Sequence, residues 1–236
     1  MINTTGSIRS SNFPKFRIFC LILEFYYNSE IMKRFLLLFF LLNGFFVNAQ
    51  VGFGTVGGLD IYQRFSNPKD NIAYSSAGNI LFNFIYGPKI YAGSKNLSVS
   101  LETQVNLGLT SLAIKDFKGV GALSFPVLCK LNFKGLSGFS TGLTSGFAIG
   151  AGIQYSKTEL FGLLDAFEDK GVKRDFFKTY FAQIDLGYGS FGIDGSFYLR
   201  LGYDPVKKSN TFNLGLVYNS NHTFRKKMNK KNYEVK

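Results

Sequence analysis

Apolar and polar residues alternate almost without interruption between Leu97 and Leu109. The apolar positions are Leu97, Val99, Leu101, Val105, Leu107 and Leu109, with Thr103 as the one mild exception. Successive side chains of a β-strand point to opposite faces, so the pattern predicts a strand with one apolar and one polar face. Strands usually have about 5–6 residues, whereas a tilted membrane crossing needs roughly 9–11. The length of the alternation therefore indicates a transmembrane β-strand.

The same alternation recurs along the chain after Gln50. It predicts eight strands, at 51–63, 79–92, 97–109, 120–133, 139–155, 177–188, 191–203 and 210–221. Short and long connections alternate between them: the short ones are Gly93–Asn96, Lys134–Gly138 and Gly189–Ser190, and the long ones are 64–78, 110–119, 156–176 and 204–209. Outer-membrane barrels have short periplasmic turns, long extracellular loops and an even number of strands. Residues 50–222 are therefore predicted to form an all-β fold, an eight-stranded antiparallel up-and-down transmembrane β-barrel.

The charged residues within the predicted strands all lie on the face opposite the apolar row. They are Asp60, Lys89, Glu102, Lys130, Asp185, Asp194 and Arg200. A Lys or Arg on the lipid-facing side at the bilayer midplane costs about 2–4 kcal/mol, so this placement predicts a charge network in the lumen. We expect Glu102 and Lys130 to pair there. A charge at Leu101 or Val105 should block assembly, whereas Gln104→Glu should be tolerated.

Alternation alone does not separate a membrane barrel from a secreted soluble β-sandwich or lipocalin-like barrel, in which the apolar face points inward. Long strands, and a polar face rich in the small residues that suit a narrow lumen, favour the membrane barrel. Of the 236 residues 17% are aromatic, which favours β structure. Those near strand ends are expected to form girdles at the membrane interface. They are Tyr86, Phe133, Phe139, Tyr155, Tyr188, Phe191, Tyr203 and Tyr218.

An export signal is predicted at residues 32–49. A short basic start, Met32–Arg34, is followed by an apolar core, Phe35–Leu42, and by a junction that ends at Ala49. This is the pattern of a secretory signal peptide, and it predicts cleavage between Ala49 and Gln50. The apolar core is shorter than the roughly 20 residues of a membrane-spanning helix.

Residues 1–31 precede this signal, although a signal peptide is expected to begin a chain. We therefore expect that Met1 is a mis-called start and that Met32 is the true one. The alternative is a genuine N-terminal extension that carries a second apolar patch, Phe16–Tyr27, which Glu24 interrupts.

Residues 223–236 form a basic tail, predicted to lie in the periplasm because an even number of strands returns the chain to the side where it began. The tail either contacts anionic lipid head groups or is a solvated end. The whole chain has a formal net charge of +12. Because an exported protein is separated from nucleic acid, we expect no nucleic-acid partner despite this charge.

The chain carries few residues suited to acid–base chemistry. His222, the single His, is predicted to lie at the periplasmic end of the last strand as an interfacial polar residue. Loss of Cys20 with the leader leaves Cys129 alone, and we expect it to be a small buried hydrophobe. No transition-metal ligand set is present, so we predict no enzyme activity, metal site or cofactor.

Two carboxylates offer the sharpest candidate site. A two-residue turn at Gly189–Ser190 would place Tyr188 opposite Phe191, and Asp185 directly opposite Asp194. Like charges facing each other destabilise a sheet, so either a cation lies between them or one carboxyl keeps its proton. The functional interpretation is a proton or cation site; the structural one is an internal salt-bridge network that plugs the barrel.

The longest loop, 156–176, has the features of a helix. Ser156 and Glu159 have the spacing of a capping box, and apolar residues follow at helical spacing. We predict a short amphipathic helix at the outer mouth of the barrel. It would act either as a lid packed on the rim or as a docking surface for an external partner.

The stretch Ser124-Phe-Pro-Val-Leu-Cys-Lys-Leu-Asn-Phe133 resembles a strand of the PorT-like outer-membrane barrels, in which Pro, apolar residues and a Lys precede an aromatic residue. The Asn48-Ala-Gln50 junction is similar to cleavage sites of such proteins, which we group with the small OmpA/OmpX-like barrels. The resemblance covers residues 50–222 and implies an outer-membrane location without implying one activity. Members include secretion accessories. The basic tail after Asn221 departs from barrels that end on an aromatic strand residue.

Three functions remain open at this point. The first is a monomeric, non-enzymatic barrel in outer-membrane lipid with a structural or interaction role, in adhesion or assembly, with an extracellular or periplasmic protein as its partner. The second is a narrow channel or proton/cation conduit through the charged lumen. The third is a secreted soluble barrel that binds a ligand. An eight-stranded lumen is just wide enough for side chains to fill, which disfavours a general porin.

Overall fold

A computed structural model describes residues 33, 49–69, 77–111, 120–161 and 174–234. The chain divides into two units, Met1–Val47 and Asn48–Lys236, and the second contains the fold. Its elements in chain order are β1 (Gln50–Ser66), β2 (Ala77–Gly93), β3 (Leu97–Thr103), β4 (Val105–Gly108), β5 (Thr110–Ser111), β6 (Val120–Lys134), the 3-10 turn η1 (Gly135–Ser137), β7 (Thr144–Phe161), β8 (Phe177–Ser190), β9 (Ile193–Tyr203), β10 (Asn210–Asn221) and α3 (His222–Glu234).

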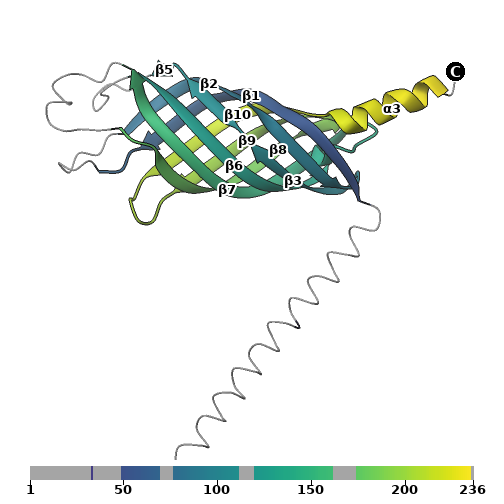
Figure 1. Cartoon of the computed structure of the whole chain (residues 1–236), viewed down its shortest axis with the longest axis horizontal. Helices are drawn as coiled ribbons and strands as arrows, with labels where there is room; N and C mark the ends of the chain where they lie inside the picture. Colours follow the sequence, from purple (N-terminus) through teal and green to yellow (C-terminus); the bar gives the residue numbers. More distant parts are fainter. Residues whose placement is uncertain (1–32, 34–48, 70–76, 112–119, 162–173, 235–236) are drawn as a thin grey trace, which may run out of the picture. The chain divides into compact units, whose positions relative to one another are not determined.

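The strands close into a ring of antiparallel pairs (Figure 1). Each strand pairs with its neighbours in sequence, and β1 pairs with both β2 and β10, which leaves the sheet without a free edge. β3, β4 and β5 follow one another along β2 as one interrupted strand, so eight strands surround the lumen. The first of the two interruptions falls at Gln104, whose N–H donates to the carbonyl of Pro126 (2.8 Å). Proline has no N–H to return the bond. The predicted eight-stranded antiparallel barrel is confirmed.

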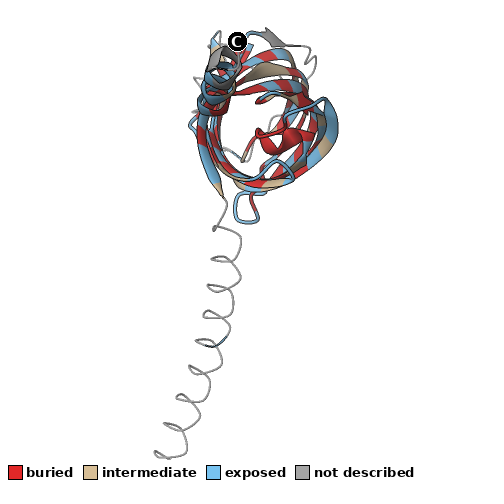
Figure 2. Ribbon diagram, turned by 90° about the vertical axis from the view of Figure 1, so that its right-hand side faces the viewer, coloured by how far each residue is buried: buried red, intermediate tan, exposed pale blue. Residues whose placement is uncertain are grey.

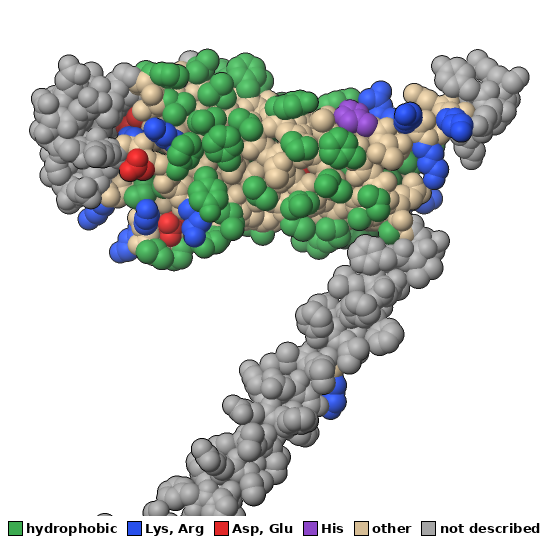
Figure 3. Space-filling model, viewed as in Figure 1, with side chains coloured by type: hydrophobic (Ala, Val, Ile, Leu, Met, Phe, Trp, Pro, Cys, Tyr) green, Lys and Arg blue, Asp and Glu red, His purple; other side chains and the backbone are tan. Residues whose placement is uncertain are grey.

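The barrel presents its apolar residues outward and buries its polar residues. In β3 the outward Leu101 is 49% exposed, while the neighbouring Ser100 and Glu102 are 1% and 0% exposed. Buried and exposed residues alternate along the strands in Figure 2, and hydrophobic side chains are spread over the face of the barrel that Figure 3 shows between its two ends. A soluble lipocalin-like barrel would have the opposite arrangement. The outer face therefore fits lipid, as a transmembrane barrel requires.

The connection between β6 and β7 differs from its prediction as a tight turn. Positive φ at Lys134 (52°) and Gly138 (75°) directs the chain inward, so η1 lies within the ring of strands and β7 starts at Thr144 instead of residue 139 (Figure 2). Phe139, expected in an outer girdle, is 2% exposed inside the barrel. The inward-facing Gly146 and Gly189 make room, since a Cβ on either would lie within 2.5 Å of the backbone of this segment. We call residues 135–140 the plug.

The turn between β8 and β9 lies at Phe191–Gly192, not at the predicted Gly189–Ser190. Both turn residues have positive φ, 50° and 74°, as a type I′ hairpin turn requires. The shift changes the register, so Asp185 pairs with Tyr198 and Gly189 pairs with Asp194. The predicted pairing of Asp185 with Asp194 is therefore wrong, although both carboxylates still face the lumen.

Gly192→Ala is expected to lower the free energy of unfolding by about 1–2 kcal/mol, because a side chain is strained at positive φ. The added Cβ would also lie 2.9 Å from a ring carbon of Phe224. Urea unfolding in detergent micelles, followed by the gel mobility of folded and unfolded protein, measures the change. Gly142→Ala is the matched control, because a Cβ there meets nothing within 4 Å. Equal stability of the two variants would contradict the strained turn.

Two further segments differ from their predictions. Residues Ser156–Glu159, the expected start of a loop helix, belong to β7, which continues to Phe161; residues 162–173 lie outside the described part of the chain. The basic tail forms the helix α3, which was not predicted, and Arg225, Lys226 and Lys227 on it are exposed. The first turn of α3 is capped where the N–H of Phe224 donates to Asn221 Oδ1 (3.1 Å). No described helix is long and apolar enough to cross a membrane.

Candidate functional site in the barrel lumen

The seven charged residues singled out in the sequence all lie inside the barrel. Strand alternation directs them inward from β1, β2, β3, β6, β8 and β9. Their side chains belong to residues that are 2% exposed or less: Asp60, Lys89, Glu102, Lys130, Asp185, Asp194 and Arg200. Buried charges are costly unless they are paired or hydrogen-bonded, so their partners determine what the lumen can do.

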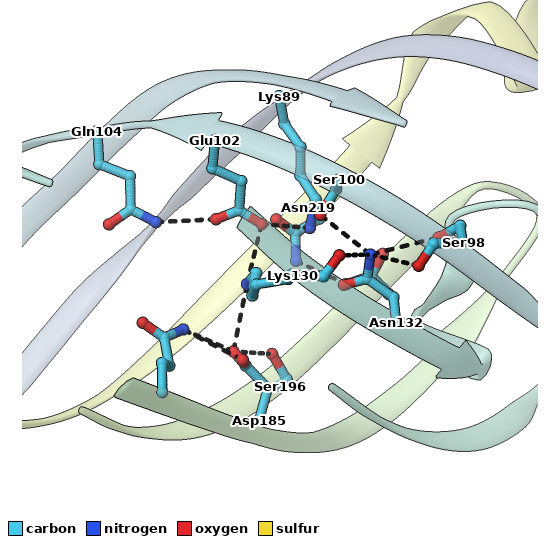
Figure 4. Close-up of polar contacts among 12 residues, drawn as sticks. Lys89, Ser98, Ser100, Glu102, Gln104, Lys130, Asn132, Asp185, Ser196 and Asn219 are labelled. Carbon is cyan, nitrogen blue, oxygen red and sulfur yellow. Dashed lines mark hydrogen bonds and ion pairs between the residues drawn. The ribbon is translucent and has the colours of Figure 1, made fainter. Parts of the chain in front are cut away.

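Four of these residues form one connected ion cluster (Figure 4). Glu102 Oε1 lies 2.6 Å from Lys89 Nζ and 2.9 Å from Lys130 Nζ. Lys130 Nζ continues the chain to Asp185 Oδ1 at 3.5 Å. The expected contact between Glu102 and Lys130 is confirmed, because their strands β3 and β6 are neighbours. The cluster joins the neighbouring strands β2, β3 and β6 to β8. It therefore connects β6 with β8 directly, although β7 lies between them in the sheet.

Arg200 forms a second connection that crosses the lumen. Its Nε donates to Gln183 Oε1 (2.8 Å), its Nη1 to Gln154 Oε1 (3.1 Å) and its Nη2 to Gln104 Oε1 (2.9 Å). Four strand steps around the ring separate β9 from the strand that carries Gln104, so this contact joins opposite walls. The guanidinium also lies over the ring of Phe181, 4.6 Å from its centroid.

Three glutamines were not singled out as site residues from the sequence, because they carry no charge. Gln104, Gln154 and Gln183 are all inward-facing and 3% exposed or less. Two of them connect Arg200 to the ion cluster: Gln104 Nε2 donates to Glu102 Oε2 (3.0 Å), and Gln183 Nε2 donates to Asp185 Oδ1 (3.0 Å). Their alternate placement on polar faces was the available signal.

Asp60 and Asp194 lie outside this ion cluster. Asp60 Oδ2 accepts hydrogen bonds from Asn213 (2.9 Å) and Asn83 (3.3 Å), and Asp194 Oδ1 accepts one from Asn219 (2.6 Å). Among the described residues, no basic group lies within ion-pair distance of either carboxylate. One oxygen of each, Asp60 Oδ1 and Asp194 Oδ2, is buried without a hydrogen-bond partner.

The plug closes the lumen at the end where β1 begins and β10 ends, which we call the turn end. Ser98 Oγ donates to the carbonyl of Ser137 (2.7 Å), and Asn221 Nδ2 donates to that of Gly138 (3.1 Å). Phe139 makes edge-to-face contacts with Tyr91 (6.1 Å between centroids) and with Phe224 of α3 (5.7 Å). Toward the opposite, loop end, the apolar side chains of Phe65, Ile80 and Ala122 pack together inside the barrel.

His222 and Cys129 lie on the outer surface. His222 is the first residue of α3, with Nε2 3.2 Å from Thr55 Oγ1 and Nδ1 3.4 Å from Ser220 Oγ. Cys129 faces outward on β6, so the prediction of a buried cysteine is wrong: its thiol belongs to the lipid-facing surface. Within the described ranges, no three His, Cys, Asp or Glu side chains are grouped to hold a metal ion.

No protein-family model and no curated protein matches the chain. Among solved structures, it is similar to Neisserial surface protein A with a TM-score of 0.40 and 12% identity, covering 74% of this chain and 99% of that one. The similarity to the outer membrane protein OprG of Pseudomonas aeruginosa has a TM-score of 0.39 and 10% identity, and it covers 72% of this chain and 96% of that one. The similarity to Ail, the attachment invasion locus protein of Yersinia pestis, has a TM-score of 0.34 and 9% identity, and it covers 71% of this chain and 98% of that one.

Proposed function

We propose that the chain is an integral outer-membrane barrel with a structural or interaction role, in adhesion or as an assembly accessory, and that it is not an enzyme. The observation that carries the proposal is the contact of Arg200 with Gln104 across the lumen. Together with the ion cluster and the plug, it fills the interior with side chains that bind one another. The barrel is then a rigid support that presents its loops at one end and the basic helix α3 at the other.

Several finer points belong to the same proposal. Cleavage between Ala49 and Gln50, loss of residues 1–31, a monomeric state and kinship with the PorT-like barrels are our expectations from the sequence. The outward apolar face supports insertion into outer-membrane lipid. Outer-membrane fractionation with heat-modifiable gel mobility tests the location, and release of the protein by carbonate washing would contradict it.

A proton or cation conduit is the second candidate. It is favoured by Asp60 and Asp194, each of which has one buried carboxylate oxygen without a hydrogen-bond partner, at different depths of the barrel. Passage of a cation through the lumen would require the plug to move aside and the hydrogen bonds of Arg200 to break. The remaining alternative, a soluble ligand-binding barrel, conflicts with the outward apolar face.

Planar-bilayer recordings distinguish the two candidates. We expect the wild-type protein to show no reproducible openings, because Arg200 and the plug obstruct the lumen. Arg200→Ala removes the contact between opposite walls and should produce small openings, whereas the control Lys207→Gln, an exposed charge at the loop end, should not. Wild-type openings that Asp194→Asn abolishes would overturn the closed barrel and support the conduit.

A further inference from the structure

A shallow apolar groove of about 530 Å³ lies on the outer face of the barrel, across β8, β9, β10 and β1. Its floor is at Gly195, whose cross-strand partners are Tyr188 on β8 and Tyr218 on β10. Gly195 faces outward, and a Cβ on it would meet nothing within 4 Å. The exposed side chains of Phe197 and Leu216 form the next part of the wall. One missing side chain between two tyrosines thus creates the depression.

A basic group is held at the turn end of this groove. Ser220 lies two residues beyond Tyr218 on the same face of β10, roughly 7 Å along the strand. Its Oγ accepts a hydrogen bond from Arg225 Nη1 (3.2 Å) and also lies 3.4 Å from His222 Nδ1. The stem of Arg225 packs on the turn, since a Cβ on Gly192 would be 3.1 Å from Arg225 Cγ.

The guanidinium of Arg225 is exposed and free to bind an anion. In the described part of the chain, no carboxylate lies within ion-pair distance of it, and its hydrogen bond to Ser220 goes to a neutral hydroxyl. Lys226 and Lys227 follow it on α3 and are exposed as well. Figure 3 shows basic side chains gathered at this end of the barrel, beside the hydrophobic outer surface. The charge on this rim is therefore positive, next to an apolar depression that faces lipid.

We propose that this surface binds an anionic phospholipid, with its phosphate at Arg225 and an acyl chain over Gly195. A guanidinium can donate two parallel hydrogen bonds to a phosphate, and tyrosines such as Tyr188 and Tyr218 prefer the membrane interface. The groove faces the hydrocarbon, so an acyl chain is the occupant that the surroundings supply. The inference rests on the proposed membrane placement and adds a specific lipid contact to it.

Native mass spectrometry of the full chain, purified from membranes in detergent, tests the site. The protein is offered phosphatidylglycerol and phosphatidylcholine in equal amounts, and the retained lipid is counted. We expect a preference for phosphatidylglycerol of about fivefold, the ratio equivalent to about 1 kcal/mol for one basic residue near a charged surface. Arg225→Gln should bring the ratio close to one. Gly195→Leu should reduce retention of both lipids and leave the ratio unchanged.

Two control variants make the test specific. Lys207→Gln removes an exposed charge at the loop end, and Ala151→Leu places the same leucine side chain on the outer face of β7. Both should behave as the wild type. Unchanged binding by Arg225→Gln or by Gly195→Leu overturns the lipid site, as does an equal loss in either control. Heat-modifiable mobility is recorded for every variant: folded wild-type protein that retains no lipid refutes the site alone, whereas protein that never inserts refutes the membrane placement.

Discussion

Glu102→Gln is expected to lower the free energy of unfolding by about 3–5 kcal/mol, the usual cost of removing one partner from a buried ion pair. Glu102 is fully buried and accepts from two ammonium groups, Lys89 at 2.6 Å and Lys130 at 2.9 Å. Lys130 would keep its ion pair with Asp185. Lys89 would lose Glu102, the one carboxylate within ion-pair distance of it among the described residues. Urea unfolding in detergent micelles, followed by gel mobility, measures the loss.

The double variant Glu102→Gln/Lys89→Gln separates the unpaired charge from other effects. It removes the unpaired ammonium group of Lys89 together with the carboxylate of Glu102, and it should recover more than half of the lost stability. Asp175→Asn, which alters an exposed carboxylate, should change stability by less than about 0.5 kcal/mol. If the double variant is as unstable as Glu102→Gln alone, the loss does not come from Lys89.

The direction of each side chain could be predicted from the sequence because it depends only on the two-residue period of a strand. A charge on the lipid face is costly, so the face that carries Glu102 had to be the lumen. The contact between Glu102 and Lys130 followed from the same argument, since adjacent strands bring inward side chains together. The period and the lipid penalty act locally, and neither depends on the details of the turns.

The cross-strand partners depend on the turns and were harder to predict. Gly189–Ser190 has turn composition, but the chain turns at Phe191–Gly192, where Phe191 takes a positive φ that is rare for a bulky residue. This moves the turn by two residues and keeps every side chain on its face, so Asp185 and Asp194 stay buried while their pairing changes. The plug was missed for a related reason. It needs the space that Gly146 leaves on β7 and Gly189 leaves on β8, which turn composition does not reveal.

The hydrogen bonds made by the glutamine side chains in the lumen could not be predicted from the sequence either. Gln104→Glu looked harmless because Gln104 faces a polar interior. In the structure its amide nitrogen donates to Glu102 Oε2 (3.0 Å) while its oxygen accepts from Arg200 (2.9 Å). A carboxylate at this position would keep the bond to Arg200 and repel Glu102. The expectation of tolerance therefore no longer holds.

Leu101→Lys should lower the stability of the membrane-inserted barrel by about 2–4 kcal/mol, the cost of a Lys facing lipid near the bilayer midplane. Leu101 is 49% exposed on the outer face of β3. It lies four residues from the strand start at Leu97, about 13 Å along the strand at roughly 3.3 Å per residue. That distance puts its side chain deep within an apolar band about 25 Å tall. Urea unfolding from lipid vesicles measures the effect, and the yield of heat-modifiable protein reports assembly.

Val51→Lys is the matched control, because Val51 also faces outward but lies at the start of β1, beside the turn end. The cost of a Lys falls to about 0–1 kcal/mol near the interface, so this variant should assemble almost normally. A difference between the two positions reports depth in a bilayer, which a soluble barrel does not sense. If Leu101→Lys and Val51→Lys are equally well tolerated, the apolar outer face does not meet lipid and the transmembrane assignment fails.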